Sequence, residues 1–302
     1  AGGAGGTSAY HAHGTAYNVG QNGLDTQSTS TSGGTSTPLI HQGVHVNGGS
    51  GGAGLIGNGG FGSGNALFTS YSFKNGGQGG GQNTTARVAY GGFGGGGSGG
   101  GNPGGGGGGI NGGIFGYSGW NPNLRTDYNK GGGGGGSYVS PSGINGSHKT
   151  SNHNTHGMLT IVAGANPNNI LYAFTSHTFT NCGSVGRQGP TLSDCTSSYG
   201  SGSSYWWNNT NLFTVTGASG VNGIQVWTVP ATKNYTITAK GAREGLSTGK
   251  GAIVEATFAL TAGDKYMILV GQMGSAGTGD GGWWASGGGG GTFMVKGDDY
   301  TN

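Results

Sequence analysis

Charged residues are scarce in this chain of 302 residues. Only 7% of the residues are charged, whereas about a quarter is usual in a soluble domain, and the twelve lysines and arginines form no cluster. Binding to nucleic acid or to an anionic membrane surface needs clustered basic residues, so we expect neither partner. An apolar stretch of about 18 residues is also missing, and no membrane insertion is expected.

Catalytic signatures are missing as well. The nine acidic residues include no pair at a spacing that suggests a hydrolase, and no serine lies in a nucleophile elbow. Matches to the spaced-glycine pattern of dinucleotide-binding proteins carry no information in a chain this rich in glycine. The sequence therefore predicts a protein that is not an enzyme and that uses no cofactor.

Histidines are the remaining candidates for metal binding. His11 and His13 would share one face of a strand, and His148, His153 and His156 lie close together in the sequence. Zinc sites use such side chains, but exposed histidines in loops explain the same pattern without a metal. We predict no metal site.

Cysteine is almost absent, with only Cys182 and Cys195 present. An even number at close spacing suits a disulfide that closes a short loop, and two free buried thiols are the alternative. Four Asn-X-Ser/Thr sequons are candidate N-glycosylation sites: Asn83, Asn145, Asn208 and Asn234. With the low charge, these features favour an extracellular protein. The chain starts within a glycine run without a signal peptide, so we expect a processed or excised segment.

Glycine dominates what is present, with 79 glycines in the chain. That is roughly a quarter of the residues, against about 7% on average, and without a collagen period such an excess normally indicates disorder. Two features argue against disorder here. The chain has 13 Tyr, 10 Phe and 6 Trp, and the glycines are clustered, which leaves segments of ordinary strand composition between them.

The densest glycine lies within residues 66–160. Runs at 94–97, 104–109 and 131–136 end beside aromatic or aliphatic residues, whereas flexible linkers alternate Gly with Ser and lack aromatics. Consecutive glycines can form extended helices of the polyproline II type, which pack closely because they lack Cβ atoms. Ordering glycine is entropically costly, so hydrogen bonds between helices and aromatic caps must offset it. We predict a bundle of polyglycine II helices, with a flexible linker as the alternative.

The rest of the chain has the pattern of β-strands. No segment shows a helical period, so very little α-helix is expected, and residues 9–19 and 38–46 are candidate strands. Residues 170–302 alternate with a period of two, and turn sequences lie at 230–233 and 261–264. This spacing predicts an all-β fold with an antiparallel sandwich.

Two pairs of adjacent tryptophans stand out: Trp206 with Trp207, and Trp283 with Trp284. If exposed, such rings can stack on sugars or dock a partner. If buried, they cap glycine helices or fill the core, which is the more common role. They are our candidate contacts for a cell-surface glycan or protein.

Several segments together resemble one known family. The most specific run from Cys182 to Cys195 and from Trp227 to Thr232. Further matching segments bring the resemblance to nearly the whole chain: Thr178–Gly183, Gly189–Thr191, Tyr199, Gly223–Thr232, Tyr235–Ile237, Tyr266–Gly274, Thr292–Val295, Ser72–Gly77, Gly91–Gly97, Gly131–Tyr138 and His156–Ile161. They resemble the glycine-rich domain in the ectodomains of anaplastic lymphoma kinase and leukocyte tyrosine kinase.

The resemblance implies a TNF-like β-sandwich that carries a bundle of polyglycine helices, and a disulfide between Cys182 and Cys195. The order of the parts is rotated relative to the family. Residues 1–161 correspond to the second half of its domain, with polyglycine helices and closing strands; residues 162–177 form a junction; and residues 178–302 correspond to the first half, with the sandwich strands. Either the chain folds as a circular permutant with adjacent ends, or each half pairs with the complementary half of a neighbouring copy. A related possibility is that the chain is one window of a long tandem array.

We favour assembly between copies, because open sheet edges template strand addition. The first hypothesis is an extracellular structural protein, the subunit of a filament or fibre that polymerises head to tail. The second is an adhesin at the tip of a virus or phage fibre, whose rigid polyglycine scaffold displays binding loops. The third, a fragment of a receptor ectodomain, fits least, because kinase, transmembrane and growth-factor-like cysteine modules are absent.

Overall fold

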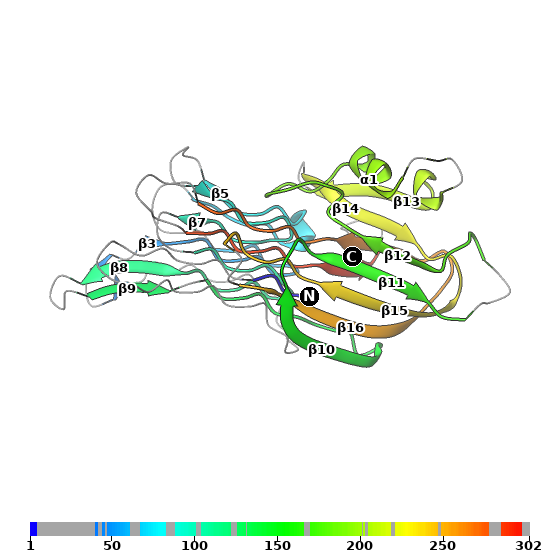
Figure 1. Cartoon of the computed structure of the whole chain (residues 1–302), viewed down its shortest axis with the longest axis horizontal. Helices are drawn as coiled ribbons and strands as arrows, with labels where there is room; N and C mark the ends of the chain where they lie inside the picture. Colours follow the sequence, from blue (N-terminus) through cyan, green and yellow to red (C-terminus); the bar gives the residue numbers. More distant parts are fainter. Residues whose placement is uncertain are drawn as a thin grey trace.

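The computed structural model shows an elongated molecule with glycine-rich segments side by side at one end and two larger β-sheets at the other (Figure 1). It describes residues 1–4, 40–41, 44–45, 47–60, 67–82, 88–100, 104–121, 126–130, 132–165, 170–200, 202, 205–218, 221–246, 249–277 and 285–297. The candidate strand at 9–19 lies outside these residues. Among them, no helix has the length and apolar character needed to cross a membrane.

The two larger sheets form the end drawn on the right of Figure 1. The first has the strand order β10-β16-β15-β11-β12, with these bounds: β10 Ile144–His153, β11 Met158–Ala163, β12 Ser176–Phe179, β15 Lys233–Lys240 and β16 Gly251–Leu260. The second has the order β13-β14-β17-β18, with these bounds: β13 Phe213–Ala218, β14 Val221–Thr228, β17 Lys265–Leu269 and β18 Phe293–Lys296. All pairings in both sheets are antiparallel.

Short elements accompany the glycine-rich segments and the loops. The strands are β1 Ile40–His41, β2 Val44–His45, β3 Asn47–Gly48, β4 Leu67–Phe68, β5 Gly81–Gln82, β6 Val88–Ala89, β7 Gly99–Gly100, β8 Tyr117–Asn121 and β9 Thr126–Lys130. The helical elements are α1 Leu192–Tyr199 and the single 3₁₀ turns η1 Phe73–Asn75 and η2 Trp206–Asn208. The candidate strand at 38–46 is therefore the two short strands β1 and β2, which pair with each other, and not one continuous strand.

The five-stranded sheet follows the alternation in the sequence. In β15, the side chains of Tyr235, Ile237 and Ala239 are buried against the main core. The opposite face carries hydroxyl pairs between strands, such as Thr236 with Thr257, whose side-chain oxygens are 2.9 Å apart. Cross-strand pairs of this kind stabilise a sheet by roughly 0.2–1 kcal/mol each. The register is therefore set by an apolar inner face and a polar outer face.

The inner strands β14 and β17 of the four-stranded sheet are largely buried on both faces. Ile268 and Val270 belong to the core between the two sheets, whereas Met267 and Leu269 pack into a second cluster with Phe73 and other residues of the glycine-rich part. A strand covered on both faces has a nearly continuous apolar sequence, as residues 266–270 do. This second cluster attaches the glycine-rich segments to the sandwich.

The run at 104–109 forms the centre of the glycine-rich end. Backbone hydrogen bonds link it and its flanking residue Ile110 to segments on several sides: Gly3, 50–53, Gly97, 113–116, 133–136 and 286–289. A β-strand has at most two hydrogen-bonded neighbours, so these glycines form a three-dimensional lattice and not a sheet. The described residues of the runs are buried, whereas the residues of a flexible linker are exposed to solvent.

The two halves of the chain pair with each other. Strands β10 and β11 of the first half form antiparallel ladders with β16 and β15 of the second half. Ala1 and Thr292 also exchange two backbone hydrogen bonds, of 2.7 Å and 2.9 Å. This intrachain closure is what the permuted-domain interpretation expects. An exchange of halves between copies stays a prediction, and it would require these ladders to open.

The all-β prediction is confirmed, since antiparallel sheets dominate and α1 is the single α-helix of the described residues. Sequence reasoning missed α1 because it looked for an apolar period over ten residues. The local signal was a capping box: the Thr191 side chain accepts from the amide of Asp194, and the Asp194 carboxylate accepts from the amide of Thr191. The TNF-like sandwich, the polyglycine II conformation and the division into two half-domains stay predictions.

Candidate functional site

A disulfide fixes helix α1 against the core of the sandwich. Cys182 and Cys195 are bonded, as the resemblance implies, and Cys195 is fully buried. Tyr199, at the end of α1, donates to Gln225 Oε1 at 2.7 Å and accepts from the amide of Thr180 at 2.9 Å. Burial raises the pKa of Tyr199 to about 12. The helix is thus tied both to the strand before it and to β14.

Next to α1, an aromatic cluster surrounds the turn η2. Trp206 and Trp207 are partly buried and pack on the main core. Tyr205 stacks on Trp207 with centroids 4.5 Å apart and planes 10° apart, and Tyr172 stacks on Trp206 at 5.4 Å and 29°. The rings therefore contact the core and also border a cavity, whereas a contact of this pair with a glycan or a partner protein stays a prediction.

That cavity has a volume of about 470 Å³. It lies between η2 and the segment that leads into β12, and its lining residues are Leu171, Tyr172, Ala173, Phe174, Thr175, Ser176, Tyr205, Trp206, Trp207, Asn209 and Leu212. Small-molecule sites in proteins usually measure about 300–1,000 Å³ and combine aromatic walls with a few polar groups. The volume of this cavity falls within that range, and aromatic rings and uncharged polar groups both belong to its lining.

His177 lies in β12 beside the same cluster. Its ring is 4.6 Å from the Tyr199 ring and 5.3 Å from the Trp207 ring. Burial lowers its pKa to about 4, and its Nε2 atom has no hydrogen-bond partner among the described residues. His177 is therefore neutral at neutral pH, and no sequence pattern distinguished it from the other histidines.

A second cavity, of about 560 Å³, lies between the two sheets beside β18. Its lining is mainly apolar and comes from β16, β18 and the segment that leads into β10, including Val139, Val254, Ala256, Phe258, Phe293, Met294 and Val295. We call it the apolar groove. Strand β18 is the last strand of its sheet, and among the described residues no strand pairs with its outer edge.

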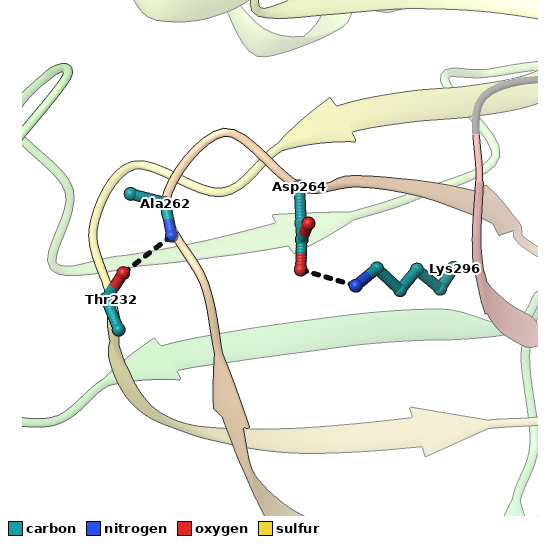
Figure 2. Close-up of polar contacts among 4 residues, drawn as sticks. All are labelled: Thr232, Ala262, Asp264 and Lys296. Atoms are coloured by element: carbon teal, nitrogen blue, oxygen red, sulfur yellow. Dashed lines mark hydrogen bonds and ion pairs between the residues drawn. The ribbon is translucent and has the colours of Figure 1, made fainter.

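A pair of turns closes the end of the sandwich next to this groove (Figure 2). The amide of Ala262 donates to Thr232 Oγ1 at 2.9 Å, which joins the two turns predicted from the sequence. Lys296, at the end of β18, lies with its Nζ 2.7 Å from Asp264 Oδ2. The ion pair is solvent-exposed and contributes little to stability, but it holds the end of β18 against the turn before β17.

Among the histidines and acidic residues, His153 and Glu244 are buried and hydrogen-bonded within the fold. His153 is buried, so the expectation of exposed loop histidines is wrong for this residue, and its ring contacts the carbonyl oxygen of His156. His11 and His13 lie outside the described residues. Buried Glu244 accepts hydrogen bonds from the amides of Leu246 and Gly249 and from the Ser286 hydroxyl. In the described part of the chain, no group of three or more His, Cys, Asp or Glu residues could hold a metal.

Three of the four sequons lie within the described residues, at Asn145, Asn208 and Asn234, and all three asparagines are exposed. Glycosylation at these positions stays a prediction. Asn83, Trp283 and Trp284 lie outside the described residues. The absence of enzymatic activity likewise stays a prediction.

Comparison with curated proteins shows a partial similarity to a receptor tyrosine kinase. Over 102 residues, 32% of this chain, the sequence is 40% identical to the leukocyte tyrosine kinase receptor of Mus musculus. The match spans 11% of that receptor. No family model matches the chain, and no solved structure matches it. The similarity to a receptor and the disulfide are both consistent with an extracellular protein.

Proposed function

We propose that the chain is a non-enzymatic, extracellular structural subunit that assembles head to tail with copies of itself into a filament or fibre. One observation carries the proposal: the outer edge of β18 borders the apolar groove and lacks a partner strand among the described residues. Exposed strand edges add strands from other chains. An apolar groove beside such an edge would accept the side chains of the added strand.

The direction of the backbone amides along β18 shows which of them face the position of an added strand. Amides alternate in direction along a strand. The amide of Gly297 donates to Lys265 in β17, and the amide of Thr292 donates to Ala1 on the opposite side. The amides of Met294 and Lys296 therefore point away from β17, toward the position of an added strand.

The shape of the site favours an open chain of subunits. Two copies of a groove cannot fill each other, so the inserted strand must come from a different surface of the neighbouring copy. Such a heterologous contact builds a filament when the rotation does not close. With only 7% of residues charged, the interface would be apolar and its strength insensitive to salt.

The glycine lattice supports a structural role. The described residues of its runs are buried and hydrogen-bonded on several sides, as a bundle of polyglycine II helices would be. Such packing makes this end of the subunit rigid. A subunit that combines this rigid end with a strand edge for assembly would build a stiff fibre.

Substitutions at Met294 test the proposal. Met294→Pro removes an outward amide while leaving the hydrogen bonds between β18 and β17 in place, and Met294→Ala removes the side chain but keeps the amide. We expect filaments by negative-stain microscopy for the parent chain and for Met294→Ala, and dispersed subunits for Met294→Pro. Filaments that form equally with all three chains would exclude the β18 edge, and a parent chain that stays monomeric at high concentration would exclude assembly.

A second candidate is a binding module, either a fibre-tip adhesin or a fragment of a receptor ectodomain. The sequence similarity to the leukocyte tyrosine kinase receptor and the aromatic cavity at η2 favour it. It predicts a monomeric chain that binds a ligand, so the microscopy separates it from the filament model.

A further inference from the structure

The cavity at η2 has the features of a ligand site that is unrelated to assembly. It shares no lining residue with the apolar groove. Tyr205, on its rim, is 46% exposed although it stacks on Trp207. A large aromatic ring held partly in solvent is a feature of recognition surfaces.

The aromatic walls are held in place before any ligand arrives. The Trp207 indole donates to the carbonyl oxygen of Gly200 at 2.9 Å, and the Tyr172 hydroxyl donates to the carbonyl oxygen of Thr228. The disulfide and the Tyr199 hydrogen bonds fix the adjacent helix. Rings that are already ordered lose little conformational entropy on binding.

The polar groups of the lining are all uncharged. They come from Thr175, Ser176, Asn209 and the tyrosines, and no Asp, Glu, Lys or Arg is among the described residues of the lining. Without a cationic side chain the cavity has no partner for a phosphate, sulfate or carboxylate, and without a carboxylate it lacks the charge that would favour an ammonium group. Aromatic faces combined with hydroxyl and amide groups suit a ligand that has apolar C–H faces and a rim of hydroxyls.

We infer that this cavity binds a neutral saccharide, with a sugar ring stacked on the aromatic pair of Tyr205 and Trp207 and its hydroxyls bonded to Thr175 and Asn209. The stacked pair of Tyr205 and Trp207 lines the same cavity as the uncharged hydrogen-bonding groups, and its volume of about 470 Å³ is large enough for one or two sugar rings. The inference does not depend on filament formation.

Isothermal titration with neutral trisaccharides tests the inference, using cellotriose, chitotriose and maltotriose as probes and choline as the cationic comparison. We expect at least one trisaccharide to bind the full chain with a millimolar or tighter Kd. Tyr205→Ala should weaken that binding at least tenfold, and Thr175→Val, which removes a hydroxyl but keeps the side-chain shape, should weaken it several-fold. Tyr90→Ala, which removes an exposed aromatic of the glycine-rich part, should leave Kd unchanged.

Three results would overturn the inference. They are the absence of trisaccharide binding up to about 20 mM, a Kd in Tyr205→Ala and in Thr175→Val equal to that of the parent chain, and binding of choline without binding of sugars. The same titration with Met294→Pro separates it from the proposed function. That variant keeps the cavity and should bind the saccharide as the parent does, whether or not filaments form.

Discussion

The backbone of Gly106 lies directly against the carbonyl group of Gly113. A Cβ atom added to Gly106 would lie 2.1 Å from that oxygen and 2.6 Å from the amide nitrogen of Gly52. Real Cβ atoms do not approach backbone atoms this closely. A side chain at this position therefore has to separate segments that are hydrogen-bonded to one another.

The first prediction concerns this contact. Gly106→Val should destabilise the chain by at least about 3 kcal/mol, because the lattice has to open to admit the side chain. Thermal unfolding followed by circular dichroism measures the effect. Gly146→Ala is the matched control, since a Cβ there would meet side-chain atoms of Val139 and Ala256 only at 3.5 Å and 3.9 Å. Unchanged melting of Gly106→Val would mean that the glycine run is not packed.

The second prediction concerns the disulfide. Cys182 and Cys195 are 13 residues apart in the sequence, and a loop of this size contributes on the order of 3 kcal/mol by restricting the unfolded chain. Replacing both residues with Ser should lower the free energy of unfolding in urea by about that amount. The parent chain under reducing conditions should lose a similar amount. Equal midpoints with and without reductant would show that the bond contributes nothing.

The third prediction concerns His177 and acid. Its pKa is lowered by burial from 6.5 to about 4 in the folded state, so the unfolded chain binds the proton more readily. Stability is therefore full above pH 6.5 and falls as the pH decreases from about 6.5 to 4. Because the ring is partly exposed, solvent screening reduces the loss to about 1–2 kcal/mol.

His177→Phe isolates this contribution from those of His153 and His156, whose pKa values are also lowered by burial. Urea unfolding at pH 7 and at pH 4.5 should show a smaller difference for the variant than for the parent chain. An identical difference in the two chains would mean that His177 does not titrate as its burial requires.

Local pattern predicted much of the two larger sheets and little of what surrounds them. The alternation of Tyr235, Ile237 and Ala239 identified the inner face of β15, and the turn at 261–264 is where the sequence placed it. The period-two description of residues 266–270 was incomplete, because it assigned one buried face where the strand has two. The second face is covered by Phe73 and its neighbours, a contact between distant parts of the chain that no local pattern contains.

The candidate sites were predictable to different degrees. The residues of the disulfide and the Trp206–Trp207 pair stand out by composition alone. The apolar groove arises where β16 and β18 meet, and the cavity at η2 lies between that turn and the segment before β12. Both join parts that are separated in the sequence, so composition does not identify them. His177 became distinctive only through the rings of Tyr199 and Trp207 around it.

A structure of the assembled form tests the central claim most directly. We predict that a strand of a neighbouring copy lies along the outer edge of β18, hydrogen-bonded to the amides of Met294 and Lys296, with apolar side chains in the groove. A filament in which that edge is covered by residues of the same chain, or in which copies touch only through small polar contacts, would contradict it.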